Sequence, residues 1–130
     1  MEKKLVFTND GSHSLFVPEI NECYHSRHGS IVEAEHVFIR NGLLAENRKQ
    51  FNILEVGFGT GLNALLTAQK AKQKNIVVNY HGIELYPVSV DNYTQLNFTD
   101  LIGIDNSELL KLHECSWEKE HTIHSFFKLT

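Results

Sequence analysis

The first fifty residues contain two short strand patterns and one helical pattern. Residues 5–8 and 14–17 are strand-like, and Asn9-Asp10-Gly11 between them is a strong turn signal. They predict a β-hairpin that ends at Pro18. Ser30 and Glu33 then have the spacing of a capping box, which predicts the start of a helix. Its apolar face would consist of Ile31, Ala34, Val37 and Phe38, and Gly42 fits just past its end.

The remainder of the chain alternates between strand and helix patterns. Residues 51–56 are an apolar run typical of a buried parallel strand. The amphipathic helix that follows extends to about Gln73 and has Leu62, Leu65, Leu66 and Gln69 on one stripe. The sequence pattern of residues 76–84 predicts a second strand, and that of residues 121–130 predicts a third. Between these strands, Pro87 predicts a helix start and Asn106-Ser107 the cap of a further helix.

The turn between the first strand and its helix has the chemistry of a nucleotide site. It reads Glu55-Val56-Gly57-Phe58-Gly59-Thr60-Gly61, an acid followed by three alternating glycines. Glycine permits close backbone approach, and the N–H groups of a first helical turn can face a ligand. A dinucleotide fingerprint would place its third glycine one position later, where this chain has Leu62. Because the acid would repel a pyrophosphate, the turn favours S-adenosylmethionine over NAD.

A second acid, Glu84, ends the second strand about 20 residues beyond the turn, where a carboxylate can accept hydrogen bonds from ribose hydroxyls. Glu84 could instead be a solvent-exposed carboxylate. Glu55 could orient the methionine end of the cofactor or have only a structural role, and Asn63 could contact the cofactor or be a polar first-turn residue. The residues expected to bind the cofactor are Glu55, Gly57, Phe58, Gly59, Thr60, Gly61, Asn63, Glu84 and Leu85.

Composition excludes several classes of protein. The 130 residues are 42% hydrophobic and 22% charged, which is typical of one globular domain. No apolar run approaches the roughly 20 residues of a membrane span, and the start lacks a secretory signal, so we expect a cytoplasmic protein without a membrane partner. Cys23 and Cys115 are far apart, and His25 and His28 lack further ligands, so we expect no metal site. The net charge of −4 does not favour strong binding of nucleic acid.

These patterns predict an α/β fold: a Rossmann-like domain of the class I adenosylmethionine-binding type, preceded by a hairpin and helix. Residues 1–50 would be the extension and residues 51–130 the first half of the Rossmann-like domain. A nucleotide site of this type lies where the strand order reverses, which requires strands on both sides of the first one. Only three strands are expected, so we expect an incomplete sheet and a fragment of a longer protein.

Several blocks of the chain resemble the tRNA 5-methylaminomethyl-2-thiouridine methyltransferase family, in its N-terminal portion. The most specific block is residues 54–63, which matches the family's cofactor loop. Residues 80–87 match its second strand and ribose-binding acid, and Leu112-His113 with Trp117 match a later segment. The opening segment of the family is matched by Tyr24-His25-Ser26 with Gly29, by Glu33-Ala34, and by residues 36–39 with Gly42-Leu43.

The resemblance implies transfer of a methyl group from S-adenosylmethionine to the aminomethyl nitrogen of a wobble uridine in tRNA. It also implies that Tyr24, His25 and Ser26 belong to a substrate site or a lid. The family continues with an acid that contacts adenine and an Asp-x-Phe-x-Pro-type segment, neither of which precedes Thr130. We therefore assign no catalytic residue and expect the chain alone to be inactive. The alternatives are a nucleotide- or partner-binding module without catalysis and a fragment of a nicotinamide-dependent oxidoreductase.

Overall fold

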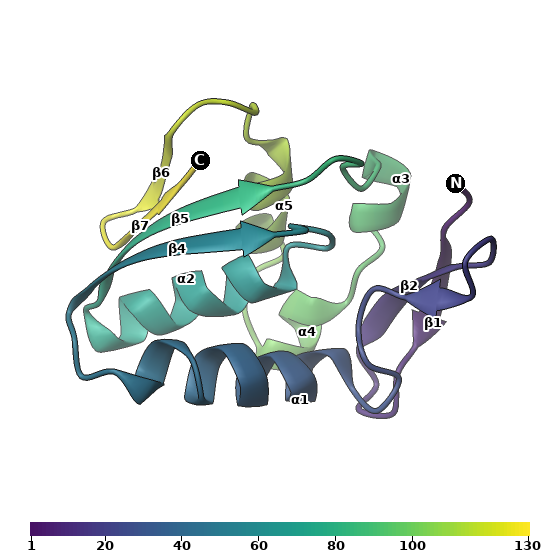
Figure 1. Cartoon of the computed structure of the whole chain (residues 1–130), viewed down its shortest axis with the longest axis horizontal. Helices are drawn as coiled ribbons and strands as arrows, with labels where there is room; N and C mark the ends of the chain where they lie inside the picture. Colours follow the sequence, from purple (N-terminus) through teal and green to yellow (C-terminus); the bar gives the residue numbers. More distant parts are fainter.

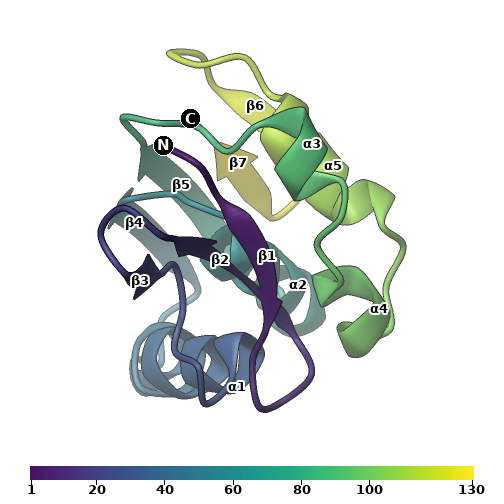
Figure 2. The same cartoon turned by 90° about the vertical axis from the view of Figure 1, so that its right-hand side faces the viewer.

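Two β-sheets organise the chain in the computed structural model, which describes residues 1–130 (Figure 1). The smaller sheet is antiparallel and consists of β1 (Lys4–Phe7), β2 (His13–Val17) and β3 (Glu22–Cys23) in that order. Its first two strands pair Leu5 with Leu15, so the predicted hairpin is confirmed. The small sheet stands beyond the carboxyl ends of the large sheet's long strands, as both views show (Figures 1 and 2).

The larger sheet has the strand order β4-β5-β7-β6 and is mixed. Strands β4 (Gln50–Val56), β5 (Val77–Ile83) and β7 (Phe127–Leu129) are parallel, and β6 (His121–His124) is antiparallel to β7. The single third strand expected over residues 121–130 is therefore wrong. The chain reverses after His124, where the Phe126 N–H donates to His124 Nδ1 over 3.1 Å.

Helices cover one face of the larger sheet. Helix α2 (Leu62–Lys74) packs against β5, and α1 (Ser30–Ala34) lies beside α2 with its continuation, a π-helix over Glu35–Arg40 (Figure 1). A 3₁₀ turn (Leu43–Ala45) leads to β4. The later helices are α3 (Val90–Tyr93), which begins three residues after Pro87, α4 (Phe98–Ile102) and α5 (Ser107–Glu114). None of the helices has the length and apolar character needed to cross a bilayer.

One hydrophobic core joins the N-terminal helix to the α2 and β5 layer. Ala34, Ile39, Leu65 and Val78 are among its fully buried members. The opposite face of β4 is uncovered, and Leu54 and Val56 are 64% and 77% exposed. The strand is parallel as predicted, but it is buried on one face only in this chain.

The hairpin turn caps the N-terminal helix. Thr8 Oγ1 accepts from the Ser30 N–H at 3.1 Å, Ser12 Oγ from the Ile31 N–H at 3.3 Å, and Asp10 Oδ2 from the Val32 N–H at 3.0 Å. These bonds satisfy amides that a helix cannot pair internally.

The helix itself differs from the expectation in two respects. The capping box is wrong, because Ser30 Oγ donates to the His13 carbonyl and Glu33 Oε1 accepts from the Ser26 N–H. The expected apolar face is also only partly correct. Because the helix widens to a π-helix after Ala34, Ile39 enters the core while Val37 and Phe38 remain about half exposed.

We expect Asp10 to make the fold sensitive to acid. Although partial burial opposes ionisation, hydrogen bonds from Ser12, Val32 and Thr8 lower the pKa of Asp10 from 3.8 to about 2. A carboxyl whose pKa falls on folding contributes stability above its unfolded pKa, and this contribution is lost as the pH drops from 4 towards 2. Asp10→Ala should lower the free energy of unfolding by about 1 kcal/mol at pH 7, as for other lost helix caps. Urea unfolding between pH 2 and pH 7 measures both effects, with Glu19→Gln as the charge-matched control.

We also expect the chain to self-associate through β4, which has a hydrogen-bonded neighbour on one side only. An open strand edge with exposed apolar side chains invites pairing with another chain, and a lysine on it opposes such pairing. Gel filtration of Leu54→Lys should therefore show less self-association than the parent chain. A change at an exposed leucine elsewhere, Leu101→Lys on α4, should have no such effect. A parent chain that is monomeric at all concentrations would contradict this expectation.

Candidate functional site

The glycine turn after β4 is anchored to the end of β5. The Gly57 and Phe58 N–H groups both donate to the Ile83 carbonyl, at 2.7 and 3.1 Å. The Gly59 N–H donates to Glu84 Oε2 at 2.8 Å, and the other carboxylate oxygen of Glu84 accepts from the Tyr86 N–H at 3.0 Å. The turn and the second acid, which the sequence placed about 20 residues apart, are therefore in direct contact.

Two glycines are required by close contacts at this turn. Gly59 has φ +56°, and a Cβ added to it would lie 3.1 Å from the Tyr24 ring. A Cβ at Gly82 would lie 2.8 Å from Cδ2 of Phe58, whose ring packs over β5 at this point. Gly82 was not expected to have a role. Its only signal in the sequence is a glycine inside a strand pattern, which is typical of a close approach by another group.

A groove of about 610 Å³ runs along the glycine turn and β4. It brings together eight of the residues expected at the site: Tyr24, His25, Glu55, Gly57, Phe58, Gly59, Thr60 and Asn63. Gly61, Glu84 and Ser26 lie outside its lining, and so does Leu85, which is 78% exposed. The Ser26 hydroxyl accepts from the His28 N–H at 3.2 Å.

The inner wall of the groove carries a pair of polar side chains with unused acceptor atoms. Asn63 Nδ2 donates to Glu55 Oε2 at 2.7 Å, which fixes the orientation of the Asn63 amide. Glu55 Oε1 and Asn63 Oδ1 are buried and have no hydrogen-bond partner. Burial raises the pKa of Glu55, and the charge of Glu84 adds to this, against the opposing effect of the Asn63 amide and the nearby Tyr80 phenol. Two buried acceptors without donors suit a ligand that supplies N–H or O–H groups.

Tyr80 belongs to this wall and was missed as a site residue. Burial and the charge of nearby Glu55 raise the pKa of the Tyr80 phenol, so it stays protonated. The parallel register pairs Ile53 with Tyr80, which puts Tyr80 on the same sheet face as Glu55. Strand alternation could have found it. The other wall comes from the N-terminal segment and includes Phe38, Leu43 and Arg48. None of the three was predicted as a site residue, although Phe38 and Leu43 lie in the segment that resembles the family's opening.

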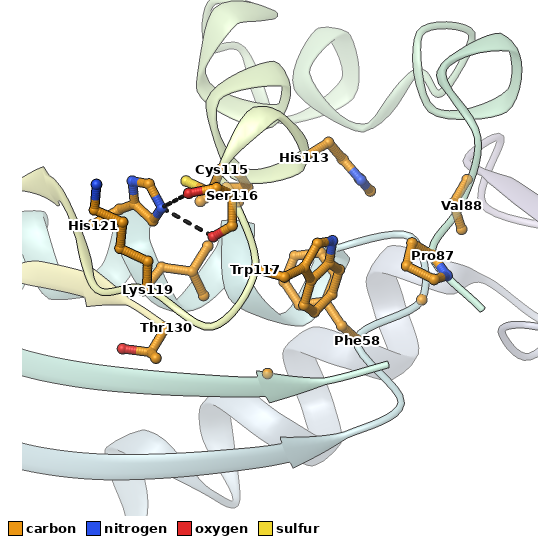
Figure 3. Close-up of a pocket in the computed structure, with 14 residues that line it drawn as sticks. Phe58, Pro87, Val88, His113, Cys115, Ser116, Trp117, Lys119, His121 and Thr130 are labelled. Carbon is orange, nitrogen blue, oxygen red and sulfur yellow. Dashed lines mark hydrogen bonds between the residues drawn. The ribbon is translucent and has the colours of Figure 1, made fainter. Parts of the chain in front are cut away.

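A second, much smaller pocket of about 40 Å³ lies between the glycine turn and α5 (Figure 3). Trp117 meets the Phe58 ring edge to face, with ring centres 6.3 Å apart. His121 Nε2 lies within 3.1 Å of both the hydroxyl and the carbonyl oxygen of Ser116. This pocket is too small for a nucleotide. No group of three or more His, Cys, Asp or Glu side chains is placed to hold a metal ion.

No protein-family model matches the chain. Among curated proteins, the tRNA 5-methylaminomethyl-2-thiouridine biosynthesis bifunctional protein MnmC of Burkholderia thailandensis is 44% identical over 94 residues, which are 68% of this chain and 14% of that protein. The MnmC protein of Cupriavidus metallidurans is 34% identical over 98 residues, or 71% of this chain and 14% of the relative.

Among solved structures, the crystal structure of MnmC2 from Aquifex aeolicus has the same fold, with a TM-score of 0.67 and 24% identity over 98% of this chain and 41% of that one. This likeness and the mixed sheet confirm the predicted α/β fold. The chain spans about one seventh of the length of the curated relatives. The resemblance expected from the sequence is confirmed: the chain is a member of the MnmC family and corresponds to one part of its longer relatives.

Proposed function

We propose that the groove binds S-adenosylmethionine and that the chain is the first half of a class I methyltransferase domain. The observation that carries this proposal is the pair of buried acceptors, Glu55 Oε1 and Asn63 Oδ1, which make no hydrogen bond within the protein. The protonated α-amino group of adenosylmethionine would supply donors and a positive charge at this place. A carboxylate beside the turn disfavours a pyrophosphate, and so disfavours NAD.

The remaining groups fit the other parts of the same cofactor. The carboxylate oxygens of Glu84 each accept one backbone N–H and retain a lone pair, so ribose hydroxyls can still donate to them. Leu85, exposed beside Glu84, offers an apolar surface to the base. Tyr24 lies against Gly59 and would cover a ligand on the turn. When bound, the cofactor supplies an activated methyl group, and the role of these residues is to hold and orient it.

We further propose that the acceptor is the aminomethyl nitrogen of a wobble uridine in tRNA. The support is the process for which the relatives are named, tRNA 5-methylaminomethyl-2-thiouridine biosynthesis. The chain itself has a net charge of −4, so contacts to tRNA phosphates would come from local groups such as Arg40, Arg48 and Lys49, or, in the longer relatives, from parts that this chain does not match. A binding module without catalysis is the alternative that the following experiments separate.

Glu55→Gln should weaken ligand binding without lowering the free energy of unfolding. The neutral amide keeps the shape of the side chain but removes the charge that attracts an ammonium group, so we expect the Kd for adenosylmethionine to rise at least about tenfold. Because burial raises the pKa of Glu55, ionised Glu55 destabilises the fold at neutral pH, and the variant should unfold no more readily than the parent. Titration calorimetry and urea unfolding give the two values, with Glu114→Gln as the control. Tight NAD binding without a response to adenosylmethionine would contradict the cofactor proposal.

The acceptor proposal is tested on a full-length relative from Burkholderia thailandensis. Incubation with methyl-labelled adenosylmethionine and tRNA that carries the aminomethyl group should place the label in the wobble nucleoside. Binding of tRNA should weaken steeply as salt rises. Label found only in protein or in a small molecule would reject the tRNA assignment and leave the cofactor assignment intact. The 130-residue chain serves as the matched comparison, in which we expect binding of the cofactor without transfer.

A further inference from the structure

Two histidines from distant parts of the chain converge on one residue of the glycine turn. Thr60 is fully buried. His25, just after β3, places Nε2 at 2.6 Å from Thr60 Oγ1. His113, near the end of α5, places Nε2 at 2.8 Å from the Thr60 carbonyl oxygen. Thr60 is therefore held from two sides, through its side chain and through its backbone.

Each histidine ring is itself fixed by its surroundings. His113 stacks on Tyr93 with ring centres 4.5 Å apart and planes 9° apart, and it meets Phe58 edge to face. His25 meets Phe98 edge to face, and its backbone N–H donates to Ser14 Oγ at 3.0 Å. Because the two rings are already held in place, they lose little conformational entropy when they hydrogen-bond to Thr60. These hydrogen bonds can therefore restrict the motion of the glycine turn.

The chemistry of the two contacts is well defined. A carbonyl oxygen only accepts, so His113 must donate from Nε2. Burial lowers the pKa of His113, and it lowers the pKa of His25 to about 4, so His25 is neutral at pH 7. The Thr60 hydroxyl can donate to or accept from neutral His25. Neither histidine brings a charge to the groove.

We infer that His25 and His113 are positioning residues that hold Thr60, and through it the glycine turn, in the conformation that receives the ligand. For the identity of that ligand the inference rests on the proposed function. His25 acts through Thr60 in this arrangement, since its Nε2 atom is occupied by the Thr60 hydroxyl. Gly59 and Asn63, on either side of Thr60, are the groups whose placement depends on this contact.

The test is amide hydrogen exchange of residues 57–61, measured with the Kd for adenosylmethionine. His25→Leu and His113→Leu should each increase exchange in this segment and weaken binding about three- to tenfold, as expected for one lost hydrogen bond. His113→Gln should recover most of both values, because a glutamine Nε2 can donate to the same carbonyl. His124→Leu is the matched control, since His124 Nε2 lies 2.9 Å from the Ala68 carbonyl oxygen of α2, away from the turn.

A double-mutant cycle distinguishes positioning from general stabilisation. Thr60→Val removes the hydroxyl that His25 contacts and keeps the carbonyl that His113 contacts. His25→Leu should therefore change little further in the Thr60→Val background, while His113→Leu should add its full effect. Exchange that rises equally in β2 and in the turn, or full additivity for His25 and Thr60, would overturn the inference. If the parent chain binds no adenosylmethionine, the proposed function fails, while the exchange data still decide the role of the histidines.

Discussion

The attachment of the glycine turn to the end of β5 is the constraint on which the site depends. Three consecutive backbone N–H groups, from Gly57 to Gly59, are used to fix the turn to the Ile83 carbonyl and the Glu84 carboxylate. A turn held in this way presents Glu55 and Asn63 in one fixed arrangement. The cost is two buried acceptor atoms without partners, which lowers the stability of the protein alone. Under the proposed function, the ligand would supply the missing donors.

The N-terminal extension is part of this site. Its hairpin turn caps α1 through Thr8, Asp10 and Ser12, which orients the helix against the core. The segment that leaves the small sheet then places Tyr24 and His25 on the glycine turn. The small sheet thus covers the carboxyl ends of β4 and β5, where parallel α/β sheets bind ligands (Figure 2). Residues 1–50 and residues 51–130 together form the groove.

Local patterns predicted the elements better than the contacts between them. The hairpin, α2, β4 and β5 follow from turn chemistry and apolar periodicity. The glycine turn with Glu55 was recognisable from the spacing of its glycines between a strand and a helix. The capping of α1 was not predictable, because its partners come from a turn twenty residues earlier. The π-helix and the reversal after His124 were missed because neither produces a recognisable change in the spacing of apolar residues. Tyr80 could have been found from strand alternation, whereas His113 reaches the glycine turn through helix packing, which a single sequence does not specify.

The most direct test of the cofactor proposal is an NMR titration of the isotope-labelled chain with adenosylmethionine. We expect the largest amide shift changes in residues 55–63 and at Glu84, with the Asn63 side-chain amide among them, and little change in β6 and β7. The same titration with NAD should leave these signals unmoved. Changes confined to the small pocket around Trp117, or saturable changes with NAD alone, would contradict the assignment of the groove to adenosylmethionine.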